Sequence, residues 1–210
     1  MALSLPTEIL MEIFSNLPPR DLYSLSVTCK QYRTLLWSVT STTQCIWRTS
    51  RQSFFEDLTL PPPEGMSEQY YIWLMVLLDK CQFCNEGAKF KLTMYWEFRM
   101  YCCESCLKER TISQQVLVNE SRIPEILIPC MPYVRRNSDP CEPQLFLKKD
   151  VVSTLAFYEN LIPEEKENWI ILQKEKISKL SMDNEGYNIQ HDRTRYDINE
   201  LIVRTLSRYL

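Results

Sequence analysis

The sequence has little histidine, little glycine and no long apolar run, and each shortage argues against a class of function. It contains one histidine, His191, and three glycines, and no glycine stands in a phosphate-binding loop pattern. A catalytic Ser–His–Asp or Cys–His group is not indicated, because that histidine lies far along the chain from any marked nucleophile. The strongest apolar run, residues 70–78, is far shorter than the roughly 20 residues that span a bilayer. We therefore expect no glycine-rich phosphate loop, no Ser–His–Asp or Cys–His catalytic group and no membrane partner.

Charge of one sign is not concentrated anywhere in the chain either. The formal net charge is −3, and no long basic block is present, so we expect no nucleic-acid partner. Hydrophobic residues make up 45% and charged residues 24% of the sequence, which is typical of a globular chain. The first residues lack the basic start and apolar core of a signal peptide. We therefore expect the protein in the cytoplasm, the nucleus or both.

Cysteine, in contrast, is plentiful, and four of the nine cysteines form two C-x2-C pairs. In a reducing compartment cysteines are metal ligands or buried thiols more often than disulfides. The pairs are separated by residues 85–102, which fits the spacing of about 15 to 20 residues that is typical of zinc sites. Each pair places two thiolates on one tight turn, and two such turns complete a tetrahedron. We therefore predict one structural zinc ion, bound by Cys81, Cys84, Cys103 and Cys106.

Two alternatives to this ligand set stay open. The four thiols could be buried without a metal, and Cys102 could replace its neighbour Cys103. We prefer Cys103 because it keeps two residues between the members of the pair. Four thiolates leave no open coordination position, so the zinc would stabilise the fold and have no catalytic role.

Residues 1–54 have the periodicity of short helices. Pro6 followed by Glu8 predicts a helix start, because proline there loses no hydrogen bond and an acid favours the positive end of the helix dipole. Apolar residues recur at helical spacing over 5–17, and further helices are expected from Pro19, over 29–37 and around Ile46 and Trp47. The apolar residues of 5–17 are more than a small unit can bury internally, so the excess packs on a partner or on the rest of the chain.

The remainder of the chain is expected to be mainly helical with a small β element. Three consecutive prolines predict a stiff linker over 55–65, and Ser67 is a candidate cap of a helix that runs toward Lys80. Residues 89–101 favour strands, whereas the many prolines of 112–147 indicate loops. Helices are expected over 148–182, with a break at Pro163, and over 198–210.

We therefore predict a mainly α fold with a small β zinc-ribbon-like element. The expected parts are a helical domain over 1–54, a proline-rich linker over 55–65 and a zinc-containing, mainly helical domain over 66–210. Residues 81–106 form the zinc segment of this last domain.

The residue pattern of the first part carries a family resemblance. It reads Leu5-Pro6-x-x-Ile9-Leu10-x-x-Ile13-Phe14-x-x-Leu17-Pro18, then Arg20-Asp21-Leu22-x-x-Leu25-Ser26-x-x-Cys29-Lys30-x-Tyr32-Arg33, then Trp47. These prolines, this periodicity and the late tryptophan resemble the F-box family. The sequence departs from the family at Tyr32, where tryptophan is common, and in the Ser/Thr-rich stretch before Trp47. An F-box followed by a cysteine-containing domain resembles uncharacterised F-box proteins of fungi.

The resemblance implies a three-helix F-box that binds the Skp-type adaptor of an SCF ubiquitin ligase and, through it, the cullin. The rest of the chain would then recruit a protein target for ubiquitin conjugation and proteasomal degradation. The chain itself would be a non-catalytic substrate adaptor. The positions that match the family's adaptor contacts are Leu5, Pro6, Ile9, Ile13, Leu17 and Leu22, whereas Leu10, Phe14, Leu25 and Trp47 match positions that hold the helices together.

Two other functions stay open at this point. A zinc-ribbon protein that binds nucleic acid or acts in transcription is one, although Lys89, Lys91 and Arg99 are few and are interleaved with apolar residues. The other is an F-box protein that binds the adaptor without the cullin. The sequence does not separate this function from that of a ligase subunit.

Overall fold

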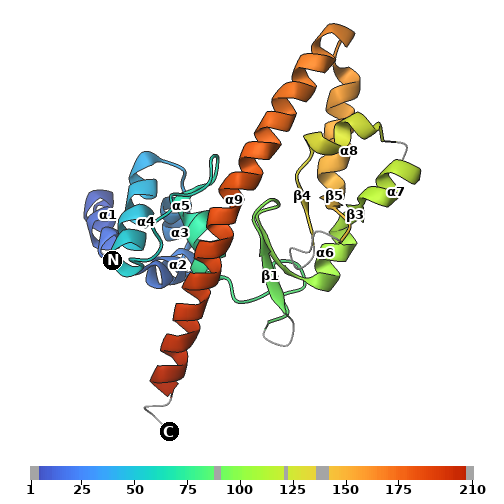
Figure 1. Ribbon diagram of the computed structural model, residues 1–210. Helices are drawn as coiled ribbons and strands as arrows, with labels where there is room; N and C mark the ends of the chain where they lie inside the picture. Colours follow the sequence, from blue (N-terminus) through green and yellow to red (C-terminus); the bar gives the residue numbers. More distant parts are fainter. Residues whose placement is uncertain (1–4, 88–90, 121–122, 136–141, 207–210) are drawn as a thin grey trace. The chain divides into compact units, whose positions relative to one another are not determined.

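The chain divides into two compact units, and the second is inserted in sequence between two segments of the first. The computed structural model describes residues 5–87, 91–120, 123–135 and 142–206, with side chains as far as Arg195 (Figure 1). The first unit comprises Met1–Leu78 and Gln190–Leu210, and the second comprises Asp79–Ile189. The expected mainly helical fold with small antiparallel sheets is confirmed. The functional domain bounds expected from the sequence stay a prediction.

Short helices whose starts are marked in the sequence form most of the first unit. Pro6 is the N-cap of the first helix, and Pro19 is the first residue of the second, where its missing N–H costs no hydrogen bond. Thr40 caps the fourth helix with its side chain, which accepts a hydrogen bond from the backbone N–H of Thr43. The four helices are α1 (Thr7–Ser15), α2 (Pro19–Thr28), α3 (Lys30–Leu36) and α4 (Ser41–Phe54).

The core of the first unit is apolar, and Trp47 lies within it. This side chain is fully buried, and its indole N–H donates to the carbonyl of Leu36 at 2.7 Å, so its one polar group is satisfied. Full burial of each large apolar side chain contributes about 1.5–3 kcal/mol. The prediction that Leu10, Phe14 and Trp47 hold these helices together is confirmed. The buried cluster consists of Leu10, Phe14, Leu22, Leu36, Ile46, Trp47 and Ile72, with Leu25 packed against it.

A fifth helical segment completes the N-terminal part of this unit. Helix α5 (Glu68–Ile72) begins after Ser67, whose hydroxyl accepts from the backbone N–H of Tyr70 at 3.4 Å, so the predicted cap is confirmed. The segment continues as a π-helix, η1 (Trp73–Leu77).

The second unit begins with a turn that carries Cys81 and Cys84, and a hairpin and a short helix that carry Cys102, Cys103 and Cys106 follow it. Strands β1 (Leu92–Tyr95) and β2 (Met100–Cys103) pair antiparallel, and helix α6 (Glu104–Arg110) follows at once. Helices α8 (Lys148–Asn160) and α9 (Pro163–Leu206) form a helical hairpin (Figure 1). The predicted break at Pro163 is confirmed. The helix expected from residue 198 is not a separate element, because α9 runs unbroken through that position.

The prediction of loops over 112–147 is wrong for much of that region. It contains α7 (Gln114–Asn119), the 3₁₀ helix η2 (Glu125–Cys130) and a three-stranded antiparallel sheet of order β3-β5-β4. The strands are β3 (Thr111–Ser113), β4 (Tyr133–Val134) and β5 (Leu145–Leu147). All three residues of the central strand β5 are buried, and of the described prolines Pro124 is the N-cap of η2 and Pro129 lies within it, so neither interrupts a strand.

Within the described part of the chain, no helix combines the length and the apolar character needed to span a bilayer.

Candidate functional site

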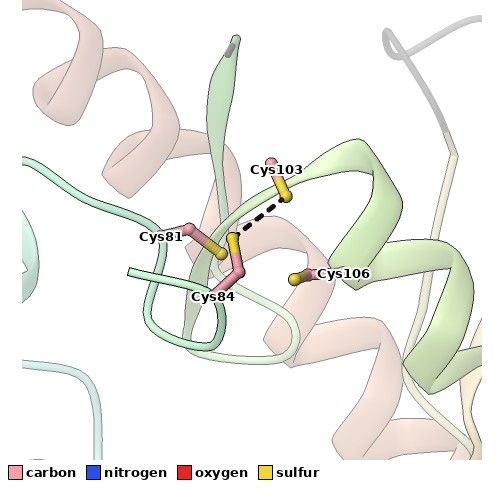
Figure 2. Close-up of side chains that lie close together, drawn as sticks. All are labelled: Cys81, Cys84, Cys103 and Cys106. Atoms are coloured by element: carbon pink, nitrogen blue, oxygen red, sulfur yellow. Dashed lines mark hydrogen bonds between the residues drawn. The ribbon is translucent and has the colours of Figure 1, made fainter. Parts of the chain in front are cut away.

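The sulfurs of four cysteines converge in the second unit. The Sγ atoms of Cys81, Cys84, Cys103 and Cys106 all lie within 4.8 Å of one another, and Figure 2 shows them pointing toward a common centre. The Cys84 and Cys103 sulfurs are 3.8 Å apart. Zn–S bonds of about 2.3 Å at tetrahedral angles place sulfurs about 3.8 Å from one another. The arrangement therefore fits a single tetrahedral metal ion.

The first pair lies on a tight turn that its own backbone closes. The N–H of Cys81 donates to the carbonyl of Glu86 at 2.8 Å, and the N–H of Asn85 donates to the carbonyl of Cys81 at 3.0 Å. Asn85 has φ 58°, in the left-handed region that asparagine tolerates better than most residues. Gln82 and Tyr101 exchange two further hydrogen bonds, which attach this turn to strand β2.

The second pair lies where strand β2 passes into helix α6. Cys103 is both the last residue of β2 and the N-cap of α6, and Cys106 lies in the first helical turn. A helix N-terminus presents free N–H groups and a positive partial charge, which favour thiolates. The spacing of two residues is therefore the spacing between an N-cap and the first turn of a helix.

The structure brings Cys103, not Cys102, to the other three sulfurs. Successive side chains of a strand point to opposite faces, so these neighbours cannot serve the same centre. Cys102 is fully buried, and burial, together with the charges of neighbouring thiolates, raises its pKa to about 12. It is therefore a core thiol.

The surroundings favour the thiolate at Cys81 but not at Cys106. Burial opposes ionisation of Cys81, but backbone N–H groups of Cys84, Cys103 and Phe83 outweigh it and lower its pKa to about 6. For Cys106, burial and hydrogen bonds to the other thiols raise the pKa instead. Four negative charges this close repel one another, and a divalent cation at their centre compensates that repulsion.

Arg110 joins the two cysteine turns in a way the sequence did not reveal. Its guanidinium lies 3.9 Å from the ring centre of Phe83, in the first turn, and donates to the carbonyl of Cys106, in the second, at 3.2 Å. Arg110 and Phe83 are far apart in sequence, and no local sequence pattern relates them.

The second candidate site is an apolar face at the start of the first unit. Leu5, Ile9 and Ile13 are spaced by four residues and are 50%, 44% and 44% exposed. Pro6 is exposed beside them, and Leu17 is half-buried. Large apolar side chains at helical spacing that remain exposed are typical of a partner-binding face.

Leu22 is the exception among the six predicted adaptor contacts. It is 0% exposed and belongs to the core cluster of the first unit. A side chain without accessible surface cannot contact a partner, so Leu22 supports the helices from within. Periodicity places it on an apolar face of α2 but does not say whether that face turns inward.

The comparison with protein families covers the segment that carries the apolar face, but it does not reach the four-cysteine site. A family model described as F-box-like matches residues 2–52. No curated protein matches the chain, and no solved structure matches it. The match covers α1 to α4 as far as residue 52, and it ends before the four cysteines.

Proposed function

We propose, from the premise that residues 2–52 form an F-box-like domain, that this protein is a substrate-recognition subunit of an SCF ubiquitin ligase. The F-box-like domain supports binding of a Skp-type adaptor. The observation that carries the proposal is the row of exposed Leu5, Ile9 and Ile13 above buried Leu10 and Phe14. The second unit then binds a protein target.

The proposed contact is a helix that lays its apolar face in a groove of the adaptor. The contact residues are Leu5, Pro6, Ile9, Ile13 and Leu17, with Leu22 behind them in the core. Covering these side chains removes apolar surface from water at about 25 cal/mol per Å². The chain contributes no catalytic group under this proposal: it holds the target close to the ubiquitin-charged enzyme and acts through proximity. Such a subunit works in the cytoplasm, the nucleus or both.

We further propose that the four-cysteine site binds one zinc ion with a structural role. Four soft thiolates in a tetrahedron suit zinc, and they leave no position open for substrate or water. The site joins the turn at Cys81, strand β2 and helix α6, which also share a buried core cluster that includes Met100, Cys102 and Leu107. Binding free energy at such a site becomes folding free energy of the unit.

Co-expression with the Skp adaptor and cullin tests the ligase role. We expect the wild-type chain to recover both, and Ile9→Asp with Ile13→Asp to weaken adaptor binding by about a hundredfold or more. The matched control is Val152→Asp with Ile171→Asp, which makes the same change on exposed side chains of the second unit. Circular dichroism verifies that each variant is folded.

The possible outcomes test both the proposed function and the assigned contact face. Failure of the wild-type chain to bind the adaptor overturns the proposal. Recovery of the adaptor without the cullin shows an F-box protein that acts outside the ligase. Equal loss of binding in the control variant shows that the assigned face is wrong.

A further inference from the structure

A groove of about 620 Å³ lies on the second unit between α7, η2 and the chain just before β5. This volume is within the range of about 300–1,000 Å³ that is usual for ligand sites. It suits a few residues of an extended chain and is too small for a folded domain. The residues that line the groove are Gln114, Gln115, Val118, Asn119, Glu125, Ile128, Pro129 and Pro143.

The apolar part of the groove is fixed by the fold. Ile128 is 8% exposed and packs in a core cluster with Phe146 of β5, so packing holds it at the floor of the groove. Pro129 and Pro143 have restricted backbones and no N–H to satisfy. The N–H of Gln114 donates to the carbonyl of Gln144 at 2.9 Å, which ties α7 to the segment that carries Pro143. The groove is therefore preformed.

The polar part of the groove has unused hydrogen-bonding capacity. Gln114, Gln115 and Asn119 lie at helix positions that share one face of α7 with Val118. None of these three amide side chains hydrogen-bonds to any residue that the structure describes. Each amide offers both donors and an acceptor, as the backbone of an extended peptide does.

Glu125 sets the charge of the groove. It alone is charged among the described residues that line it, and no described side chain forms an ion pair with it. A carboxylate beside an apolar floor favours a cationic group of a ligand over an anionic one. Lysine and arginine side chains supply that group.

We propose that the groove binds a short extended segment of the target protein that carries an apolar side chain next to a lysine or arginine. The apolar side chain lies over Val118 and Ile128, the amides of α7 pair with the peptide backbone, and Glu125 pairs with the cation. This proposal rests on the proposed function, because it names the chemistry of the target that the ligase subunit recruits.

Selection of short random peptides displayed on phage, with the full chain as bait, tests the groove. We expect enrichment of peptides with an apolar residue beside Lys or Arg. For the best peptide, made synthetically, Glu125→Lys should weaken binding about tenfold, because attraction at a surface pair becomes repulsion. The control is Glu159→Lys, which makes the same change at an exposed residue of α8 outside the groove lining. Selection on the Glu125→Lys bait should favour acidic peptides.

Each other result overturns the proposal. It fails if no peptide is enriched, if the enriched peptides show no basic preference, or if the two variants weaken binding equally. Binding to the Skp adaptor is measured with the same samples. Both variants should keep it, because the groove belongs to the second unit. If the groove binds no peptide but the chain still binds the adaptor, only the groove proposal is overturned. If the groove binds the peptide but the chain does not bind the adaptor, only the proposed ligase function is overturned.

Discussion

The hydroxyl of Tyr71 donates a hydrogen bond to Oε1 of Gln190 at 3.0 Å, across 119 residues of sequence. The Gln190 amide in turn donates to the carbonyl of Asp57 at 2.8 Å, and Arg193 pairs with the Asp57 carboxylate at 3.1 Å. The end of helix α9 therefore belongs to the same unit as the F-box-like helices. Residues 55–65, predicted from the sequence to be a stiff proline-rich linker, take part in this contact through Asp57, and the neighbouring Leu58 is buried.

Gln190→Ala tests this connection. The substitution removes the acceptor of the buried Tyr71 hydroxyl and the donor to the carbonyl of Asp57, an exposed residue, and a buried group that loses its partner costs about 1–3 kcal/mol. We expect the free energy of unfolding, measured with urea, to fall by about 2 kcal/mol. Ile189→Ala is the control, because that neighbouring side chain is 65% exposed. Equal effects of the two substitutions would show that the contact contributes nothing.

A buried ion pair links α4 to α5 and allows a second prediction. Arg51 and Glu68 are 3% and 2% exposed, with Nε and Oε2 3.1 Å apart. Arg51 also donates to the carbonyl of Leu58 at 2.5 Å. Removal of one partner leaves a buried charge uncompensated, so Glu68→Ala should lower the free energy of unfolding by about 3–5 kcal/mol.

Arg48 provides the matched control for Glu68. It binds the same carboxylate at 2.8 Å but is 56% exposed. Since an exposed pair contributes about 0–1 kcal/mol, Arg48→Ala should cost less than about 1 kcal/mol. Urea titrations of both variants show which substitution lowers the free energy of unfolding more. If Arg48→Ala costs as much as Glu68→Ala, burial does not determine the strength of this pair.

Structural features that depend on local spacing could be predicted from the sequence, whereas features that depend on packing between distant segments could not. The grouping of the two cysteine pairs was predicted because the two-residue spacing is itself a turn or a helix start, as it is at Cys103 and Cys106. Leu22 was misassigned because periodicity defines a helix face but not what covers it. The strands around β5 are too short for an alternation signal. Nothing in the sequence around Tyr71 or around Gln190 indicates the hydrogen bond between them.

Removal of one cysteine should separate the metal ligand from its neighbour. We expect the purified chain to contain about one zinc ion, Cys103→Ser to lose it, and Cys102→Ser to retain it. The second substitution still costs stability, because it buries a hydroxyl in an apolar site where Cys102 is 0% exposed. Elemental analysis of metal per chain distinguishes the two. Zinc lost from Cys102→Ser but kept in Cys103→Ser would reverse the ligand assignment.

His191 gives the first unit a predictable response to acid. Burial and the neighbouring charge of Arg195 lower the pKa of His191 to about 4, although Asp192 raises it in part. Above pH 6.5 the histidine is neutral in both folded and unfolded chains and has no effect on stability. Between pH 6.5 and 4 the unfolded chain binds a proton that the folded chain excludes. The free energy of unfolding therefore falls as the pH is lowered, by about 3 kcal/mol across this window.

His191→Gln isolates this effect, because glutamine does not titrate and carboxyl groups contribute equally to both proteins. Urea titrations from pH 7 to pH 4 should show a shallower loss of stability in the variant than in the wild-type chain. His191 is the one histidine of the sequence, so NMR of its ring protons reports its protonation without overlap from another imidazole. Parallel stability curves, or a ring that titrates near pH 6.5 in the folded chain, would contradict the prediction.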